Sequence, residues 1–141
     1  MYRVIAGLKF SARWLAMLSP LAAVVVFPRF PYPTITSKVL LWSVVVEALA
    51  VVCGLWIWLA ATDRANTRLN LVHWGLLVYV GTLLLTSVMG ENVSGSIWGT
   101  LERGDGLMFY LHLAAFVYLT TLVLHSAKDY RRLLQSVVGA G

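Results

Sequence analysis

Residues 39–61 read VLLWSVVVEALAVVCGLWIWLAA, and this stretch decides the fold. It contains one charged residue, Glu47, and no proline. At about 1.5 Å of rise per residue, a helix of this length crosses a hydrocarbon layer of about 30 Å with some tilt. The stretch is apolar on all sides, as a helix in contact with lipid is. It therefore predicts a helix that spans a membrane.

Three further apolar stretches surround this one, at residues 14–27, 71–89 and 107–124. The last two approach the ~20 residues that a crossing requires. Residues 127–138 mix basic and aliphatic side chains in an amphipathic pattern suited to a membrane surface. We predict an all-α membrane protein: one membrane module over residues 1–141, with four transmembrane helices and a short C-terminal amphipathic helix.

The composition excludes several classes of protein. Hydrophobic residues make up 60% of the chain and charged residues 12%, which leaves too little polar sequence for a soluble domain. The net charge of +5 does not indicate nucleic-acid binding, because the basic residues are spread over ends and short loops. The single cysteine, Cys53, allows neither an internal disulfide nor a multi-cysteine metal site. We expect no metal and no cofactor.

The distribution of Lys and Arg predicts the orientation, because cytoplasmic loops carry the excess of positive charge. Eight basic residues lie in the N-terminal segment, in the loop of Arg64 and Arg68, and after the fourth span. The other two loops hold three, namely Arg29, Lys38 and Arg103. Both ends are therefore predicted in the cytoplasm, with the proline-rich loop and the loop of residues 90–106 outside.

Glu47 is the most costly residue in the predicted spans, because an acid at the middle of a membrane helix needs a partner or a cavity. Ser43, Glu47, Ala50 and Gly54 share one helical face. Small residues on such a face allow another helix to approach closely. Glu47 is thus predicted to be a buried polar residue, either a proton or ligand site or a neutral or paired acid that fastens two helices. We favour the second interpretation.

The histidines allow one cofactor interpretation as a minor alternative. His73 opens the third predicted span and His125 follows the fourth, both near the cytoplasmic face. Two histidines at equal depth could be axial ligands of a haem or another tetrapyrrole. Histidine is also an ordinary residue of the membrane interface, with an apolar body and a wet tip. His112, near the outer end of the fourth span, has no evident partner.

Residues 90–106 read GENVSGSIWGTLERGDG and form the densest polar stretch. Trp98 offers an interfacial anchor or a face on which a sugar can stack. Arg103 carries a planar fork of donors suited to phosphate or carboxylate. Such a lining suits an anionic, lipid-linked sugar. The alternative is a solvated loop whose acidic residues hold polar backbone in water.

The motifs in this loop have fixed spacing: GEN at 90–92, SIWG at 96–99, ERGDGL at 102–107 and LH at 111–112. They resemble the N-terminal region of the O-antigen ligase-like polysaccharide enzymes. In that family the pattern G-x-N, S-[FI]-W-G, E-R-x-x-G-L precedes a helix with a Leu-His pair. Upstream residues are similar to the family's first outer loop and second span, namely FPYP at 30–33, Thr36, Lys38 and Glu47. The resemblance covers nearly the whole chain.

This resemblance implies a substrate and a location. The full-length enzymes are metal-independent, multi-pass transferases of lipopolysaccharide biosynthesis and related pathways in the bacterial inner membrane. They move a glycan from an undecaprenyl diphosphate carrier to lipid A core, a protein or a growing chain on the outer face. The resemblance places Lys38, Trp98 and Arg103 near the carrier diphosphate or the glycan path, with Glu102 orienting Arg103 or serving the fold. Membrane lipid and a lipid-linked glycan are the implied partners.

The family's catalytic loop lies downstream of the region that this chain resembles, and nothing here replaces it. We therefore expect an N-terminal part of such an enzyme, inactive alone, or a short relative that has lost the chemistry. No catalytic residue is assigned, and His112 is not promoted to one. The alternative function is a non-catalytic membrane subunit that packs against remaining spans or other subunits. Its contact stripe on the third span comprises Gly75, Tyr79, Thr82 and Thr86.

Overall fold

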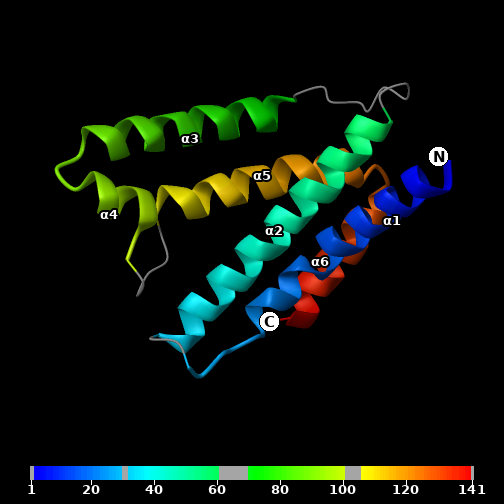
Figure 1. Cartoon of the computed structure of the whole chain (residues 1–141), viewed down its shortest axis with the longest axis horizontal. Coiled ribbons are helices and arrows are strands. Elements are labelled where there is room, and N and C mark those ends of the chain that lie inside the picture. Colours follow the sequence, from blue (N-terminus) through cyan, green and yellow to red (C-terminus); the bar gives the residue numbers. More distant parts are fainter. Residues whose placement is uncertain (1, 30–31, 61–69, 101–105, 141) are drawn as a thin grey trace.

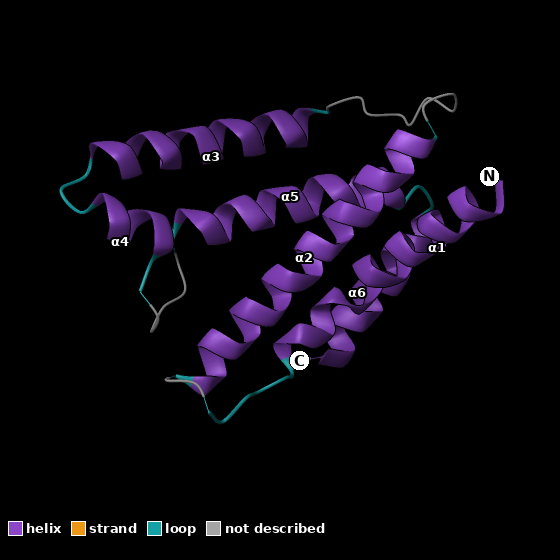
Figure 2. Cartoon of the chain, in the orientation of Figure 1, coloured by secondary structure: helices purple, strands orange, loops and turns teal. Residues whose placement is uncertain are grey.

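The computed structural model describes residues 2–29, 32–60, 70–100 and 106–140. These residues form helices and connecting segments, with no strand among them (Figure 2). The predicted all-α class is confirmed. The elements in chain order are α1 (Tyr2–Leu18), the 3₁₀ helix η1 (Ser19–Ala23), α2 (Pro33–Leu59), α3 (Leu71–Met89), α4 (Val93–Trp98), α5 (Leu107–Val123) and α6 (Ala127–Ala140).

The helices form two groups that cross obliquely (Figure 1). In one group α1 lies beside α2, and α6 packs along α1 and η1. In the other group α3 lies beside α5, and α4 contacts both of them. The two groups meet where α5 crosses α1 and α2. Residues at the start of α5 and at the end of α4 line one cavity with the first half of α2.

The start of α2 is fixed by proline and by one buried serine. Pro33 occupies the first helical position. A backbone N–H there would have no partner within the helix, so proline costs no helical hydrogen bond. Ser37 is fully buried, and its hydroxyl accepts a hydrogen bond from the backbone N–H of Phe27 at 3.0 Å. The serine therefore holds the preceding loop against the first turn of α2.

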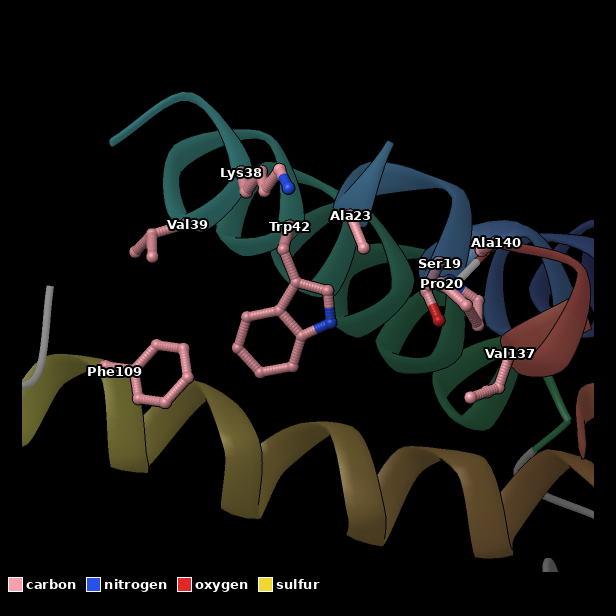
Figure 3. A pocket seen from close by; sticks show the side chains of 9 residues that line it. All are labelled: Ser19, Pro20, Ala23, Lys38, Val39, Trp42, Phe109, Val137 and Ala140. Atoms are coloured by element: carbon pink, nitrogen blue, oxygen red, sulfur yellow. The ribbon is translucent and has the colours of Figure 1, made fainter. Parts of the chain in front are cut away.

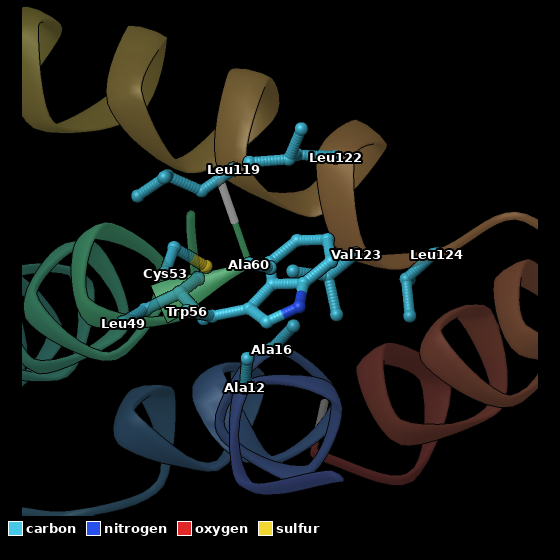
Figure 4. Packing of buried hydrophobic residues seen from close by; sticks show 10 residues of the cluster. All are labelled: Ala12, Ala16, Leu49, Cys53, Trp56, Ala60, Leu119, Leu122, Val123 and Leu124. Carbon is cyan, nitrogen blue, oxygen red and sulfur yellow. The ribbon is translucent and has the colours of Figure 1, made fainter. Parts of the chain in front are cut away.

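The apolar core lies where α1, α2 and α5 meet (Figure 4). The indole of Trp56 lies between Ala12 and Ala16 of α1 and the end of α5. The two alanines are fully buried, and their small side chains allow α1 to approach the bulkier face of α2. The core comprises Ala12, Ala16, Leu49, Cys53, Trp56, Ala60, Leu119, Leu122, Val123 and Leu124.

The second half of the predicted small-residue face of α2 does not pack against another helix, which corrects the sequence-based expectation. Glu47, Ala50 and Gly54 are exposed, and a Cβ added to Gly54 would meet no atom within 4 Å. The buried face instead carries Val46, Leu49 and Cys53. The close approach of α1 and α2 depends on alanines of α1, so α2 can bury large side chains there.

In the part of the chain that the structure describes, two helices are long and apolar enough to cross a membrane, namely Thr34–Leu59 within α2 and the whole of α3. The helix α5 is apolar but shorter, at 17 residues. The first predicted span, residues 14–27, is not one helix, because α1 ends at Leu18 and η1 at Ala23. Pro20 has no backbone N–H, so the α-helical hydrogen-bond ladder cannot continue through it. The described residues thus contain two helices of spanning length, where the sequence predicted four.

The amphipathic C-terminal helix is present as α6, but its position differs from the prediction. Its start is joined to α1 by an ion pair between Asp129 and Arg13, with 3.0 Å between Oδ2 and Nη2. Its end reaches η1, since α6 and η1 are in contact. The helix therefore runs along α1 instead of across one end of the bundle, and the two chain ends lie at opposite ends of α1 (Figure 1). The apolar face of α6 is covered only in part by this arrangement, since Leu134, Val137 and Val138 are exposed.

Candidate functional site

The site of interest is a cavity of about 470 Å³ between α2, α5 and the end of α4, here called the α2–α5 cavity. It follows α2 from Thr36 to Glu47, a length of about 16 Å at 1.5 Å per residue. Polar groups lie at both ends, and apolar side chains line the middle. The lining residues are Thr36, Val39, Leu40, Ser43, Val44, Glu47, Trp98, Gly99, Thr100, Met108, Phe109 and His112.

Glu47 and His112 form an ion pair or hydrogen bond at the inner end of this cavity. The carboxylate Oε1 of Glu47 lies 3.2 Å from Nε2 of His112. The Glu47 side chain is 67% exposed and the His112 side chain 21%. Two predictions are therefore wrong, because Glu47 is not buried and His112 has a partner. The interpretation of Glu47 as a paired acid that joins two helices agrees with this geometry.

Trp98 lies at the other end of the cavity, on the last residue of α4. Asn92 caps the start of this helix, because its Oδ1 accepts a hydrogen bond from the backbone N–H of Gly95 at 2.9 Å. Gly99 follows its last residue, with a φ of 72° that side chains disfavour. Gly106 packs against this end of α4, and a Cβ there would lie within 3.0 Å of backbone atoms. Gly99 and Gly106 thus constrain the backbone next to Trp98, whose side chain is 69% exposed.

Lys38 does not share the α2–α5 cavity with Trp98. It lines a second cavity of about 360 Å³ between η1, α2, α5 and the end of α6. Figure 3 shows the Trp42 indole in this space, with Phe109 opposite it on α5 and Lys38 one turn along α2. Val39 and Phe109 line both cavities. The structure therefore brings Lys38 and Trp98 to neighbouring cavities with a common apolar wall. Glu102 and Arg103 lie outside the described residues.

His73 has a structural role that involves both of its ring nitrogens. Nδ1 accepts a hydrogen bond from the backbone N–H of Asn70 at 3.2 Å, and the Asn70 side chain accepts one from the His73 N–H at 3.1 Å. This reciprocal cap fixes the start of α3. Because Nδ1 is an acceptor, Nε2 carries the hydrogen and donates to Oγ1 of Thr121 on α5 at 2.7 Å.

The tetrapyrrole interpretation loses a ligand in this arrangement. His73 is buried and leaves neither ring nitrogen free for a metal. His125 lies beyond the end of α5 and is largely exposed. Its partial burial, and then the charges of Lys9 and Arg13, lower its pKa, whereas Asp129 acts in the opposite direction. Within the described ranges, no group of three or more His, Cys, Asp or Glu residues could hold a metal ion.

Sequence reasoning missed the pairing of Glu47 with His112 and of His73 with Thr121. The signal for the first pair was present, because each span contains one strongly polar side chain among apolar ones. Helix spacing within a span does not show which other span lies opposite. The pairing depends on how α5 crosses α2, and this crossing is set by tertiary packing.

Comparisons with protein-family models, with curated proteins and with solved structures find no match to this chain. The functional argument therefore depends on the residues and the geometry described above.

Proposed function

We propose that this chain is the N-terminal membrane module of an O-antigen ligase-like transferase. The complete enzyme moves a glycan from an undecaprenyl diphosphate carrier at the outer face of the bacterial inner membrane. One observation carries the proposal: motif residues that are distant in sequence line a single cavity. Thr36 and Glu47 come from the upstream motif, Trp98 from SIWG, and His112 from the Leu-His pair.

The chemistry of the two cavities suits a lipid-linked glycan. Valine, leucine, methionine and phenylalanine side chains along the middle of the α2–α5 cavity match an isoprenoid chain. Trp98 at the outer end presents an amphipathic ring on which a sugar can stack. Lys38 in the adjacent cavity supplies a cation for phosphate.

In this proposal α1 with η1, and α5, also cross the membrane, which gives four spans with α2 and α3. The N-terminus, the end of α2 and the start of α3 lie in the cytoplasm, and α4 lies outside. The positive-charge distribution supports this orientation. The chain transfers no glycan by itself, and further spans supply the catalytic loop.

Binding of an undecaprenyl diphosphate analogue to the full chain in lipid nanodiscs tests the proposal. We expect weak, saturable binding that Trp98→Ala and Arg103→Ala each reduce about threefold to tenfold, since one aromatic contact is worth about 1 kcal/mol. Trp58→Ala and Arg131→Ala are the matched controls, because both residues are exposed and lie outside both cavities. Equal loss in all four variants, or no binding at all, would remove the carrier from this module.

A second candidate is a non-catalytic membrane subunit, and the exposure of α3 favours it. This helix packs only against α4 and α5 among the described elements. Tyr79, Thr82 and Thr86 are exposed, and a Cβ on Gly75 would meet no atom within 4 Å. Such an open face suits another membrane helix. A partner that copurifies in mild detergent, and is lost in Gly75→Leu, would favour the subunit; a monodisperse monomer would argue against it.

A further inference from the structure

The hydrogen-bond roles of His112 can be assigned from its two partners. Nδ1 lies 2.7 Å from the backbone carbonyl oxygen of Met108, which can only accept. Nδ1 therefore carries a hydrogen. In a neutral imidazole the other nitrogen, Nε2, then has a lone pair and no hydrogen.

This assignment leaves the contact with Glu47 one proton short. Nε2 lies 3.2 Å from Oε1 of Glu47, and an ionised carboxylate is also only an acceptor. A lone pair facing a carboxylate at this distance is repulsive. A hydrogen bond forms only when a proton lies between the two atoms, either on Nε2 or on Oε1.

We propose that Glu47 and His112 together form a proton-binding site inside the membrane module. One proton is shared between Nε2 and Oε1, in addition to the hydrogen on Nδ1. The pair is then either an imidazolium with a carboxylate or a neutral imidazole with a carboxylic acid. Its net charge is zero in both forms. The ligand of the site is the proton itself. This inference is independent of the proposed transferase function.

The position of the pair agrees with such a site. Glu47 lies near the middle of the 27-residue α2, where an uncompensated charge is most costly in a membrane. A neutral pair avoids that cost. Glu47 and Trp98 line the two ends of the α2–α5 cavity, and the Glu47 carboxylate is exposed at its end.

Among the described residues that line the α2–α5 cavity, only Glu47 and His112 carry a titratable side chain. Lys38 lies about two and a half turns away on α2 and lines the other cavity. On α1, which packs on the buried face of α2, the ammonium of Lys9 lies 5.4 Å from the centre of the Trp56 ring. Tyr110 of α5 packs on the ring of Tyr79 in α3.

Loss of the proton has a structural consequence. The pair then carries one negative charge, and two lone pairs face each other across the contact between α2 and α5. The contact between α2 and α5 at this point then lacks its hydrogen bond.

Solid-state NMR of the full chain in lipid bilayers measures the protons directly. With ¹⁵N-histidine and ¹³C-glutamate labels, and with His112→Gln and Glu47→Gln to assign the signals, we expect a protonated Nδ1 at neutral pH. We also expect either an imidazolium with a carboxylate or a neutral imidazole with a carboxylic acid. A neutral His112 with its hydrogen on Nε2, or a neutral His112 beside an ionised Glu47, would overturn the proposal.

A pH titration of the same sample gives an independent result. Because one proton is shared, the His112 and Glu47 signals should change together with a common midpoint as the pH is raised. In Glu47→Gln the amide N–H₂ donates to Nε2, so His112 should be neutral. Its NMR signals should then show no step as the pH is raised. Separate midpoints, or an unchanged step in Glu47→Gln, would contradict a shared proton. Carrier binding is tested separately, with Trp98→Ala. The transferase proposal and the shared-proton proposal can therefore each fail while the other holds.

Discussion

Gly106 lies so close to the end of α4 that no side chain fits there. A Cβ on this residue would lie within 3.0 Å of Gly99 N, the Trp98 carbonyl carbon and Ile97 O, all of them backbone atoms. Gly106→Ala must therefore push α4 away from α5 and move Trp98 from the cavity. We expect a loss of about 1–3 kcal/mol in stability, as for other overpacked sites, measured by thermal unfolding in detergent.

Gly81→Ala on α3 is the matched control, because a Cβ there would meet no atom within 4 Å. Alanine is the better helix former, so this variant should be as stable as the wild type or slightly more so. If both alanine variants unfold at the same temperature, the close contact of Gly106 with α4 does not exist.

His73 is expected to stabilise the junction of α3 with α5 and to bind no tetrapyrrole. His73→Phe leaves the Asn70 backbone N–H without its acceptor, and it removes the bond to Thr121. A loss of about 1–3 kcal/mol is expected for a partly buried group left unpaired, measured by thermal unfolding. His125→Phe, at an exposed position, should change stability little. A Soret band in the wild-type protein that vanishes in His73→Phe would contradict this role.

His125 makes the stability of the fold depend on pH. Its pKa in the folded chain is lowered from the ordinary 6.5, by burial first and then by the charges of Lys9 and Arg13. Below pH 6.5 the unfolded chain therefore binds a proton more readily than the folded one, and stability falls as the pH drops through that window. Unfolding temperatures at pH 7.5 and 5.5 should differ less in His125→Gln than in the wild type. An equal difference would exclude His125 as the cause.

At the scale of elements, the ion pair between Arg13 and Asp129 joins the start of α6 to α1. Asp129 is buried, and its carboxylate is the partner of a guanidinium on α1. Asp129→Asn removes that charge and should let α6 separate from α1. Hydrogen exchange should then rise across residues 127–140 and stay unchanged in α3. Lys128→Gln is the control, since Lys128 is exposed and next in sequence; equal exchange in both variants would mean that the ion pair does not hold α6.

The elements that hydropathy alone decides were predicted well. The structure has α3 at Leu71–Met89 as predicted, and α5 ends one residue before the predicted limit. The first helix was misplaced because its start carries Arg3, Lys9 and Arg13, which lower the hydropathy of a segment that is nevertheless helical. Hydropathy also did not reveal that α2 begins at Pro33, where proline chemistry sets the boundary.

The candidate site was predicted only in part, for a physical reason. Single residues such as Glu47 and Trp98 are conspicuous by type, so sequence reasoning selected them. Their partners come from other helices, and the crossing of α2 with α5 that joins Glu47 to His112 depends on the packing of Trp56 against α1 and α5. The separation of Lys38 from Trp98 by a shared apolar wall follows from the same crossing.

At the scale of the whole molecule, the proposed orientation makes a prediction for three surface positions. Ser94 lies on α4, Ser126 lies between α5 and α6, and Val138 lies near the end of α6; all three are exposed. Each is replaced by cysteine in turn, and intact spheroplasts are treated with a membrane-impermeant maleimide. The native Cys53 is fully buried and should not react. We expect labelling at position 94 in intact cells, and at position 126 only after lysis.

Position 138 distinguishes the two arrangements of α6. If α6 follows α1, as in the structure, its end lies near η1 at the outer side, and position 138 should be labelled in intact spheroplasts together with position 94. If α6 lies on the cytoplasmic surface, positions 138 and 126 should both need lysis. Labelling of position 126 with protection of position 94 in intact cells would reverse the orientation. It would also place the end of the α2–α5 cavity that carries Trp98 in the cytoplasm. A transferase that acts on the outer face has no substrate there.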